Sequence, residues 1–129
     1  MDFTVRPLLR GFEPNADVFV DEERGQVVVA VEVAGADPDS LRVSVDERHL
    51  FIAGRRSEVV RFRRGSFMQK EIAYGDFSKR IHLPVAVDIA DVNARYADGV
   101  LVIALPISAT AYLPTTRTEI RMIIQRTQS

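Results

Sequence analysis

The sequence predicts an antiparallel β-sandwich, and three observations support this prediction. Apolar and polar residues alternate with a period of two in several short runs, and these runs are rich in valine and isoleucine. Turn-forming residues separate the runs, and no long stretch has the apolar spacing of a helix. Alternation with β-branched residues is typical of half-buried strands, and many short strands divided by turns are typical of a sandwich.

The first expected strands precede a basic stretch of the chain. Segment 27–33 has valine at every second position, so one of its faces is apolar. Segment 41–45 alternates apolar with polar residues, and 50–52 continues the pattern. Residues 35–39 and the polar turn 46–48 divide these strands, since proline, glycine and aspartate favour turns.

The later strands follow a long connection. Apolar residues share one parity in 77–83 and occupy both parities in 100–105, and a proline ends each run. Residues 97–99 predict a hairpin because Asp-Gly tolerates positive φ, and 74–76 predict a compact turn. Only 87–94 has a helical pattern, and it is too short to organise a core.

The amino-acid composition excludes several classes of function. The 129 residues suit one domain, and a net charge of -1 gives no general attraction to nucleic acid or to anionic membranes. The absence of cysteine excludes disulfides and thiolate chemistry. No stretch is long and apolar enough to span a membrane, and charged residues, proline and glycine interrupt the first 15 residues, which argues against a signal peptide. We expect a cytoplasmic protein.

We predict no catalytic, metal or cofactor site, and therefore no enzyme. His49 and His82 lie on different expected strands, and the polar parity of His82 indicates a solvated surface residue. Asp88 and Asp91 are also expected to be solvated. The chain has no HExxH motif, no glycine-rich phosphate loop and no GxSxG elbow.

A cluster of arginines permits two interpretations. Arginine interleaved with Phe62 and Phe67 could bind single-stranded nucleic acid. The nearly neutral net charge and the lack of an RNA-binding fold pattern favour a charged, mobile loop instead. The arginines are Arg55, Arg56, Arg61, Arg63 and Arg64.

Four segments, in order along the chain, resemble a known family. The pair 16–20 and 29–35 resembles an opening strand pair that ends in an "xLPG"-like turn, and 50–56 resembles "LxIxGxR". Residues 74–84 resemble "GxFxRxxxLP", and 94–106 resemble "AxxxxGVLxIxxP". Together they resemble the α-crystallin domain of small heat shock proteins, the Hsp20 family.

The resemblance implies an immunoglobulin-like sandwich that dimerises, often assembles further, and holds unfolding proteins without ATP. It divides the chain into a short, flexible N-terminal arm at 1–15, an α-crystallin domain at 16–106 and a C-terminal extension at 107–129. Such a short arm favours dimers or modest oligomers. Two other functions stay open: a co-chaperone-like sandwich that binds a folded partner, and a nucleic-acid-binding module.

The connection between Gly54 and Phe77 is longer than a simple hairpin needs. Within it, residues 67–74 could form an additional strand. In bacterial and plant members, a strand at this place pairs with the partner subunit's strand that corresponds to 16–21. A surface loop is the alternative. Lys79 stands where the family usually has arginine, and it shares parity with apolar residues, so its charge needs a partner near the dimer interface. The residues expected in this exchange are Phe67, Met68, Lys70, Ile72 and Lys79.

The two ends of the chain carry the remaining expected contacts. Ile120, Met122 and Ile124 resemble the family's "IxI" motif, which docks in a groove of a neighbouring subunit, while Ile123 allows a second register. A final strand or a disordered end is the alternative. The expected groove residues are Leu41, Val43, Val45, Val92 and Ala94. The N-terminal candidates for contact with client proteins, or for packing inside an oligomer, are Phe3, Leu8, Leu9 and Phe12.

Overall fold

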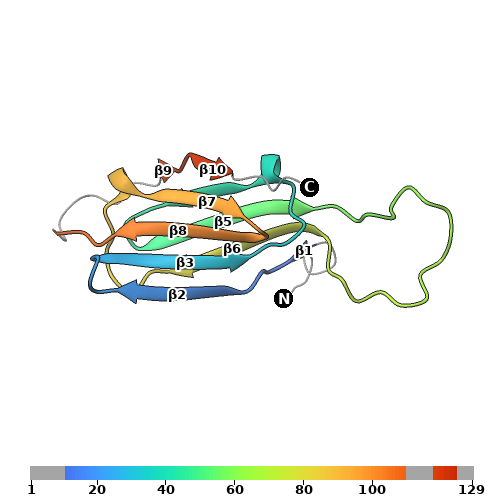
Figure 1. Cartoon of the computed structure of the whole chain (residues 1–129), viewed down its shortest axis with the longest axis horizontal. Coiled ribbons are helices and arrows are strands. Elements are labelled where there is room, and N and C mark those ends of the chain that lie inside the picture. Colours follow the sequence, from blue (N-terminus) through green and yellow to red (C-terminus); the bar gives the residue numbers. More distant parts are fainter. Residues whose placement is uncertain (1–10, 110–117, 125–129) are drawn as a thin grey trace, which may run out of the picture.

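The computed structural model describes residues 11–109 and 118–124. Within these ranges the chain forms two five-stranded sheets and two short 3-10 helices. The sheets lie one over the other, which confirms the predicted sandwich (Figure 1). No helix in the described part of the chain is long and apolar enough to cross a bilayer.

Both sheets combine long central strands with short strands at most of their edges. In the first sheet the order is β1 (Gly11–Phe12), β6 (Gly75–His82), β5 (His49–Arg56), β4 (Arg42–Val45) and β9 (Thr118–Glu119). In the second sheet it is β10 (Met122–Ile124), β7 (Asn93–Ala97), β8 (Val100–Pro106), β3 (Gln26–Glu32) and β2 (Ala16–Asp21). All pairings are antiparallel except β1 with β6 and β10 with β7.

The core lies between the two sheets and follows the alternation in the sequence. The four alternating valines of 27–33 are fully buried, as predicted. In β8, where both parities are apolar, Leu101, Ile103 and Leu105 face inward and Val102 stays exposed. A fully buried side chain of this kind contributes about 1.5–3 kcal/mol relative to an exposed one, so these inward faces hold the sheets together.

The turns agree with the sequence in part. The β7–β8 hairpin has positive φ at Asp98 (55°) and Gly99 (82°), which is the conformation that the Asp-Gly pair predicts. The predicted turn at 74–76 is wrong, because Gly75 already pairs with Arg56 at the start of β6.

The predicted helical stretch at 87–94 does not form an α-helix. It contains a single turn, η3 (Ile89–Asp91), before β7 begins, because pairing with β8 extends the backbone. Asp88 caps this turn by accepting the Ala90 N–H at 3.0 Å. Asp88 therefore has a structural contact in addition to its contact with solvent.

Close packing at Gly54 generates the first testable prediction. A Cβ atom there would lie 2.5 Å from Phe77 Cζ and 2.9 Å from Leu41 Cδ2. Overpacking of this kind costs about 1–3 kcal/mol. We expect Gly54→Ala to lower the free energy of unfolding by that amount in urea denaturation. Ala53→Val, at the neighbouring exposed position, should change it by less than about 0.5 kcal/mol. Equal effects of the two changes would contradict this packing.

Candidate functional site

An unpaired sheet edge lies along β2. This strand pairs with β3 on one side and ends the sheet on the other. Its central residues, from Asp17 to Val20, are exposed on both faces, and Phe19 is 63% exposed. An ordinary edge strand buries one face against the core. β2 therefore presents free backbone groups together with apolar side chains, which is a template for another strand.

The long connection between β5 and β6 spans residues 57–74 and extends beyond the end of the sandwich (Figure 1). It contains no strand in the single chain, so the additional strand expected at 67–74 is not formed here. Met68 is 95% exposed, and Phe67 and Ile72 are exposed as well. No neighbouring strand reaches this loop within the described residues, so its backbone has no ladder to join.

Exposed apolar side chains concentrate in these two elements. In the described part of the chain eleven large hydrophobic residues are exposed, and nine of them lie either in the 57–74 loop or in β2. Surface apolar residues that are scattered singly need no explanation, whereas a concentration marks an interaction surface. The loop contributes Val59, Val60, Phe62, Phe67, Met68 and Ile72, and β2 contributes Val18, Phe19 and Val20.

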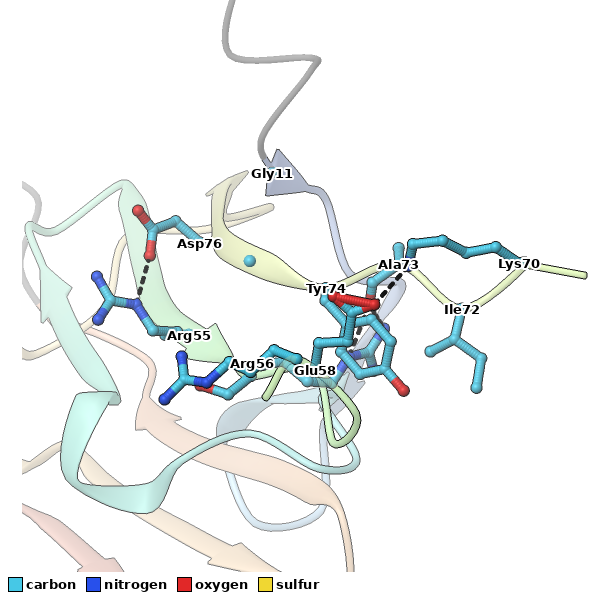
Figure 2. Close-up of a pocket in the computed structure, with 12 residues that line it drawn as sticks. Gly11, Arg55, Arg56, Glu58, Lys70, Ile72, Ala73, Tyr74 and Asp76 are labelled. Atoms are coloured by element: carbon cyan, nitrogen blue, oxygen red, sulfur yellow. Dashed lines mark hydrogen bonds and ion pairs between the residues drawn. The ribbon is translucent and has the colours of Figure 1, made fainter. Parts of the chain in front are cut away.

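Arg56 anchors the base of the loop (Figure 2). Its guanidinium donates to the carbonyls of Ala34 and Ala73, each at 2.9 Å, and lies 4.4 Å above the Phe12 ring. It thus joins β5, the end of β3, the end of the loop and β1. The interpretation of all five arginines as one solvated loop is wrong for Arg56. Arg56 has the same parity as the buried Ile52, and this parity is the feature of the sequence that indicates an inward position for Arg56.

Charged pairs surround an open pocket of about 660 Å³ at the same place. Arg55 Nε donates to Asp76 Oδ1 at 2.9 Å across β5 and β6. This hydrogen bond and the carboxylate charge raise the pKa of Arg55. Within the loop, Lys70 Nζ lies 3.4 Å from Glu58 Oε1. Both pairs are drawn in Figure 2; the first joins the two strands at the base of the loop, and the second joins two positions within the loop.

Lys79 lies near the same edge of the first sheet. It shares the inward parity of Phe77 and Ile81, and its side chain is half-buried. Its ammonium lies 3.8 Å from Glu13 Oε1, in the connection between β1 and β2. The charge therefore has a carboxylate partner in its own chain.

The C-terminal motif lies in an apolar groove between β4 and β7. The Ile120 N–H donates to the Val43 carbonyl at 2.8 Å, and Met122 pairs with Ala94. Ile120, Met122 and Ile124 all pack against the core, while Ile123 is 56% exposed. Of the expected groove residues, Leu41, Val43, Val45 and Ala94 are buried and Val92 is half-buried. In the single chain the motif occupies its own groove, and docking on a neighbour stays a prediction.

One N-terminal candidate lies within the described residues. Phe12 is half-buried, and its ring centroid lies 5.3 Å from that of Phe77. Its predicted contact with client proteins is not tested by this packing. Phe3, Leu8 and Leu9 lie outside the described residues.

These features define a class of protein: a β-sandwich subunit with a grooved side, an open edge strand and a long apolar loop. The family model described as the Hsp20/alpha crystallin family matches residues 19–123. The chain therefore belongs to the Hsp20/alpha crystallin family, as the resemblance implied.

Individual relatives agree with this membership. The chain is 31% identical over 93 residues to small heat shock protein C4 of Rickettsia felis, covering 72% of this chain and 56% of that protein. It is 32% identical over 112 residues to an alpha-crystallin of Mycobacterium bovis, covering 82% and 75% of the two chains. The match thus spans just over half the length of the Rickettsia protein.

A solved structure shares the fold. Heat shock protein 16.0 from Schizosaccharomyces pombe superimposes with a TM-score of 0.70 at 25% identity, and the alignment covers 78% of each chain.

The tail contact generates the second prediction. Ile124 is half-buried against the core, and Ile123 beside it is exposed. Because apolar burial holds the tail, Ile124→Ser should loosen it by roughly 1–2 kcal/mol, part of the value for full burial. Amide exchange of the peptide containing Ile120 should then be about tenfold faster by hydrogen-exchange mass spectrometry. Ile123→Ser is the matched control and should leave exchange unchanged. Equal acceleration by both variants would contradict the observed register.

Proposed function

We propose that this protein is an ATP-independent holdase, which binds apolar segments of unfolding proteins and delays their aggregation. Membership in the Hsp20/alpha crystallin family and the fold support a chaperone role. The observation that carries the finer proposal is the concentration of exposed apolar side chains in β2 and the 57–74 loop. Burial of apolar surface drives such binding and requires no particular client sequence.

The subunit also has the parts that association with a second copy needs. In this proposal residues 67–72 of one chain pair with β2 of another, so the open edge is completed and the exposed residues of that segment are covered. Val59, Val60 and Phe62, in the first part of the loop, stay exposed for clients. Both segments are six residues long. β2 carries Asp17 and Asp21, whereas the loop segment carries Lys70 and Glu71 and follows the basic Arg63 and Arg64. The dimer is thus the proposed working unit.

The C-terminal extension supplies a second, reversible contact in this proposal. β10 has three residues, and its side chains Met122 and Ile124 cover the apolar groove. A tail that leaves its own groove can enter the groove of a neighbour, which would extend dimers into modest oligomers. The vacated groove would also offer apolar surface to clients. The cytoplasmic location and the contact of Phe3, Leu8, Leu9 and Phe12 with clients belong to the same proposal.

The two rival functions have less support from the observed contacts. The exposed loop and the seated tail are features that a co-chaperone-like sandwich normally lacks. For a nucleic-acid surface, two of the five arginines are already engaged, Arg55 with Asp76 and Arg56 with backbone carbonyls. Arg61 lies 4.5 Å above the Phe62 ring. No catalytic role is proposed.

A light-scattering assay with a heat-labile client tests the holdase proposal. The full chain at several-fold molar excess should suppress client aggregation without ATP. Val59 and Phe62 are 83% and 86% exposed and lie outside the segment proposed for strand exchange. The double variant Val59→Ser with Phe62→Ser should therefore weaken protection several-fold while native mass spectrometry shows an unchanged assembly.

The control for that assay is Val102→Ser, which removes an exposed apolar side chain from the outer face of β8. It should protect the client as well as the parent chain does. If the parent chain gives no protection at several-fold excess, the holdase proposal fails. If the control loses as much protection as the loop variant, the loop is not the client surface.

A further inference from the structure

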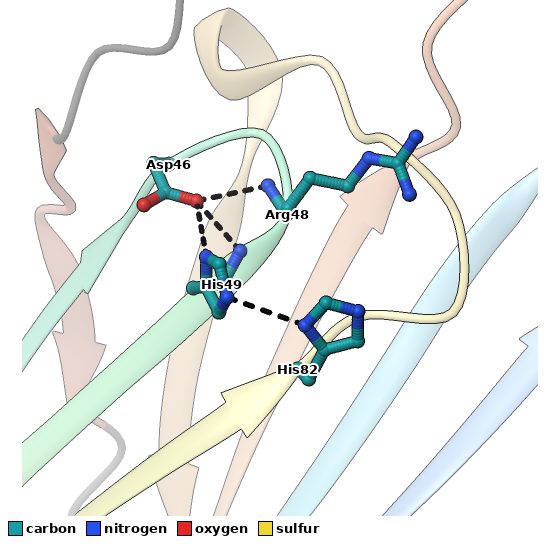
Figure 3. Close-up of polar contacts among 4 residues, drawn as sticks. All are labelled: Asp46, Arg48, His49 and His82. Atoms are coloured by element: carbon teal, nitrogen blue, oxygen red, sulfur yellow. Dashed lines mark hydrogen bonds and ion pairs between the residues drawn. The ribbon is translucent and has the colours of Figure 1, made fainter.

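Two histidines that are 33 residues apart in the sequence meet at one end of the first sheet (Figure 3). His49 begins β5 and His82 ends β6, and they lie directly opposite each other in the register. His49 Nε2 lies 3.2 Å from His82 Nδ1, and the two ring centroids are 5.0 Å apart. The contact between the two histidines could not be predicted from the sequence, because only the β5–β6 register brings the residues together.

Asp46 orients the first of these rings. Its Oδ1 atom lies 3.2 Å from His49 Nδ1 and accepts the backbone N–H groups of Arg48 and His49 at 2.9 and 2.7 Å. An acceptor oxygen in this position favours the His49 tautomer whose proton is on Nδ1. His49 Nε2 then directs a lone pair toward His82.

The distance between the two nitrogens suits a shared metal ion as well as a hydrogen bond. Zinc–imidazole bonds are about 2.0–2.1 Å long, so two nitrogens on one tetrahedral ion lie about 3.3–3.4 Å apart. The observed 3.2 Å is close to that separation, and the His82 ring is exposed. A carboxylate hydrogen-bonded to the far nitrogen of a ligating histidine is a recurrent support in metal sites. Asp46 already occupies that position.

The backbone around the pair is held in place. The Leu83 N–H donates to the Arg48 carbonyl at 2.8 Å, and the Asp46 N–H donates to the His49 carbonyl at 3.0 Å. His49 is partly shielded by Phe51, with ring centroids 6.1 Å apart. The Arg48 guanidinium points away from both rings in Figure 3. The nitrogens are therefore preorganised and remain open to solvent on the His82 side.

We propose that His49 and His82 form a binding site for a borderline divalent transition-metal ion such as Zn²⁺, with Asp46 as the group that orients His49. Within the described residues no set of three histidines, aspartates or glutamates is placed to hold an ion. The two imidazoles are therefore the protein ligands, and water completes the coordination. The bound ion links β5 to β6 and stabilises the folded state by mass action.

The test uses the full chain without an affinity tag. Titration with ZnCl₂ by calorimetry should give one ion per subunit, and Co²⁺ should develop the visible absorption of a histidine-bound ion. His82→Gln and His49→Gln should each weaken binding by at least about tenfold. Asp46→Asn should weaken it by about 10–100-fold without changing the stoichiometry, as other changes of this kind do. Zn²⁺ should raise the melting temperature of the parent chain but not of His82→Gln.

A matched control keeps two histidines on the same face but separates them. Ser78 has the same outward parity as His82 and pairs with Ala53, four positions away along β6. The double variant Ser78→His with His82→Gln should bind as weakly as His82→Gln alone. His82 is exposed, so its variants decide the question even if His49→Gln folds poorly. No binding to the parent chain, or equal binding to the parent and His82→Gln, overturns the proposal and leaves the pair as a hydrogen bond between strands.

Discussion

Backbone groups at the edge of a sheet need hydrogen-bond partners, and this requirement organises the whole subunit. The two sheets have four edges in the described part of the chain. Three are formed by strands of two or three residues from near the ends of the chain: β1 beside β6, β9 beside β4 and β10 beside β7. The fourth is β2, with six residues and no strand outside it. The long unpaired edge is therefore where another chain can add.

The closed edges differ in how firmly they are held. β1 is attached through Phe12, which packs on Phe77 beneath the guanidinium of Arg56. β9 and β10 depend on a few hydrogen bonds and on three half-buried side chains of the tail. β9 and β10 are thus held by fewer contacts than the central strands, and edges of this kind open more readily than a core.

Local alternation predicted most of the core, whereas contacts between strands lay beyond the sequence. The spacing of the valines in 27–33 identified an inward face because side chains alternate along any strand. In 100–105 both parities are apolar, so only the position of β8 within its sheet selects Leu101, Ile103 and Leu105. The contact of His49 with His82 depends on the β5–β6 register, and the single sequence carries no signal for it.

Three other features also depend on contacts between segments that are distant in the sequence. Arg56 has the parity of the buried Ile52, but an arginine beside other arginines favours a solvated position, so the sequence alone does not place it at the base of the loop. Alternation alone allows two registers for the tail, one with Ile123 facing outward and one with Ile123 facing inward. The parallel pairing of β10 with β7 selects the register in which Ile123 faces outward. The expected strand at 67–74 has no partner strand in the described part of the chain, and in the proposed exchange a second copy supplies one.

The most direct test of the open edge uses the absence of cysteine from the chain. One preparation carries Phe19→Cys in β2, and the other carries Met68→Cys or Gln69→Cys, which together sample both faces of the loop segment. After mixing and mild oxidation, pairing of the two segments brings Cα atoms to within the roughly 4.4–6.8 Å that a disulfide spans. We predict a mixed disulfide with at least one loop position, well above the yield from Phe19→Cys with Ile123→Cys. Yields no higher than that control, for both loop positions, would contradict the account.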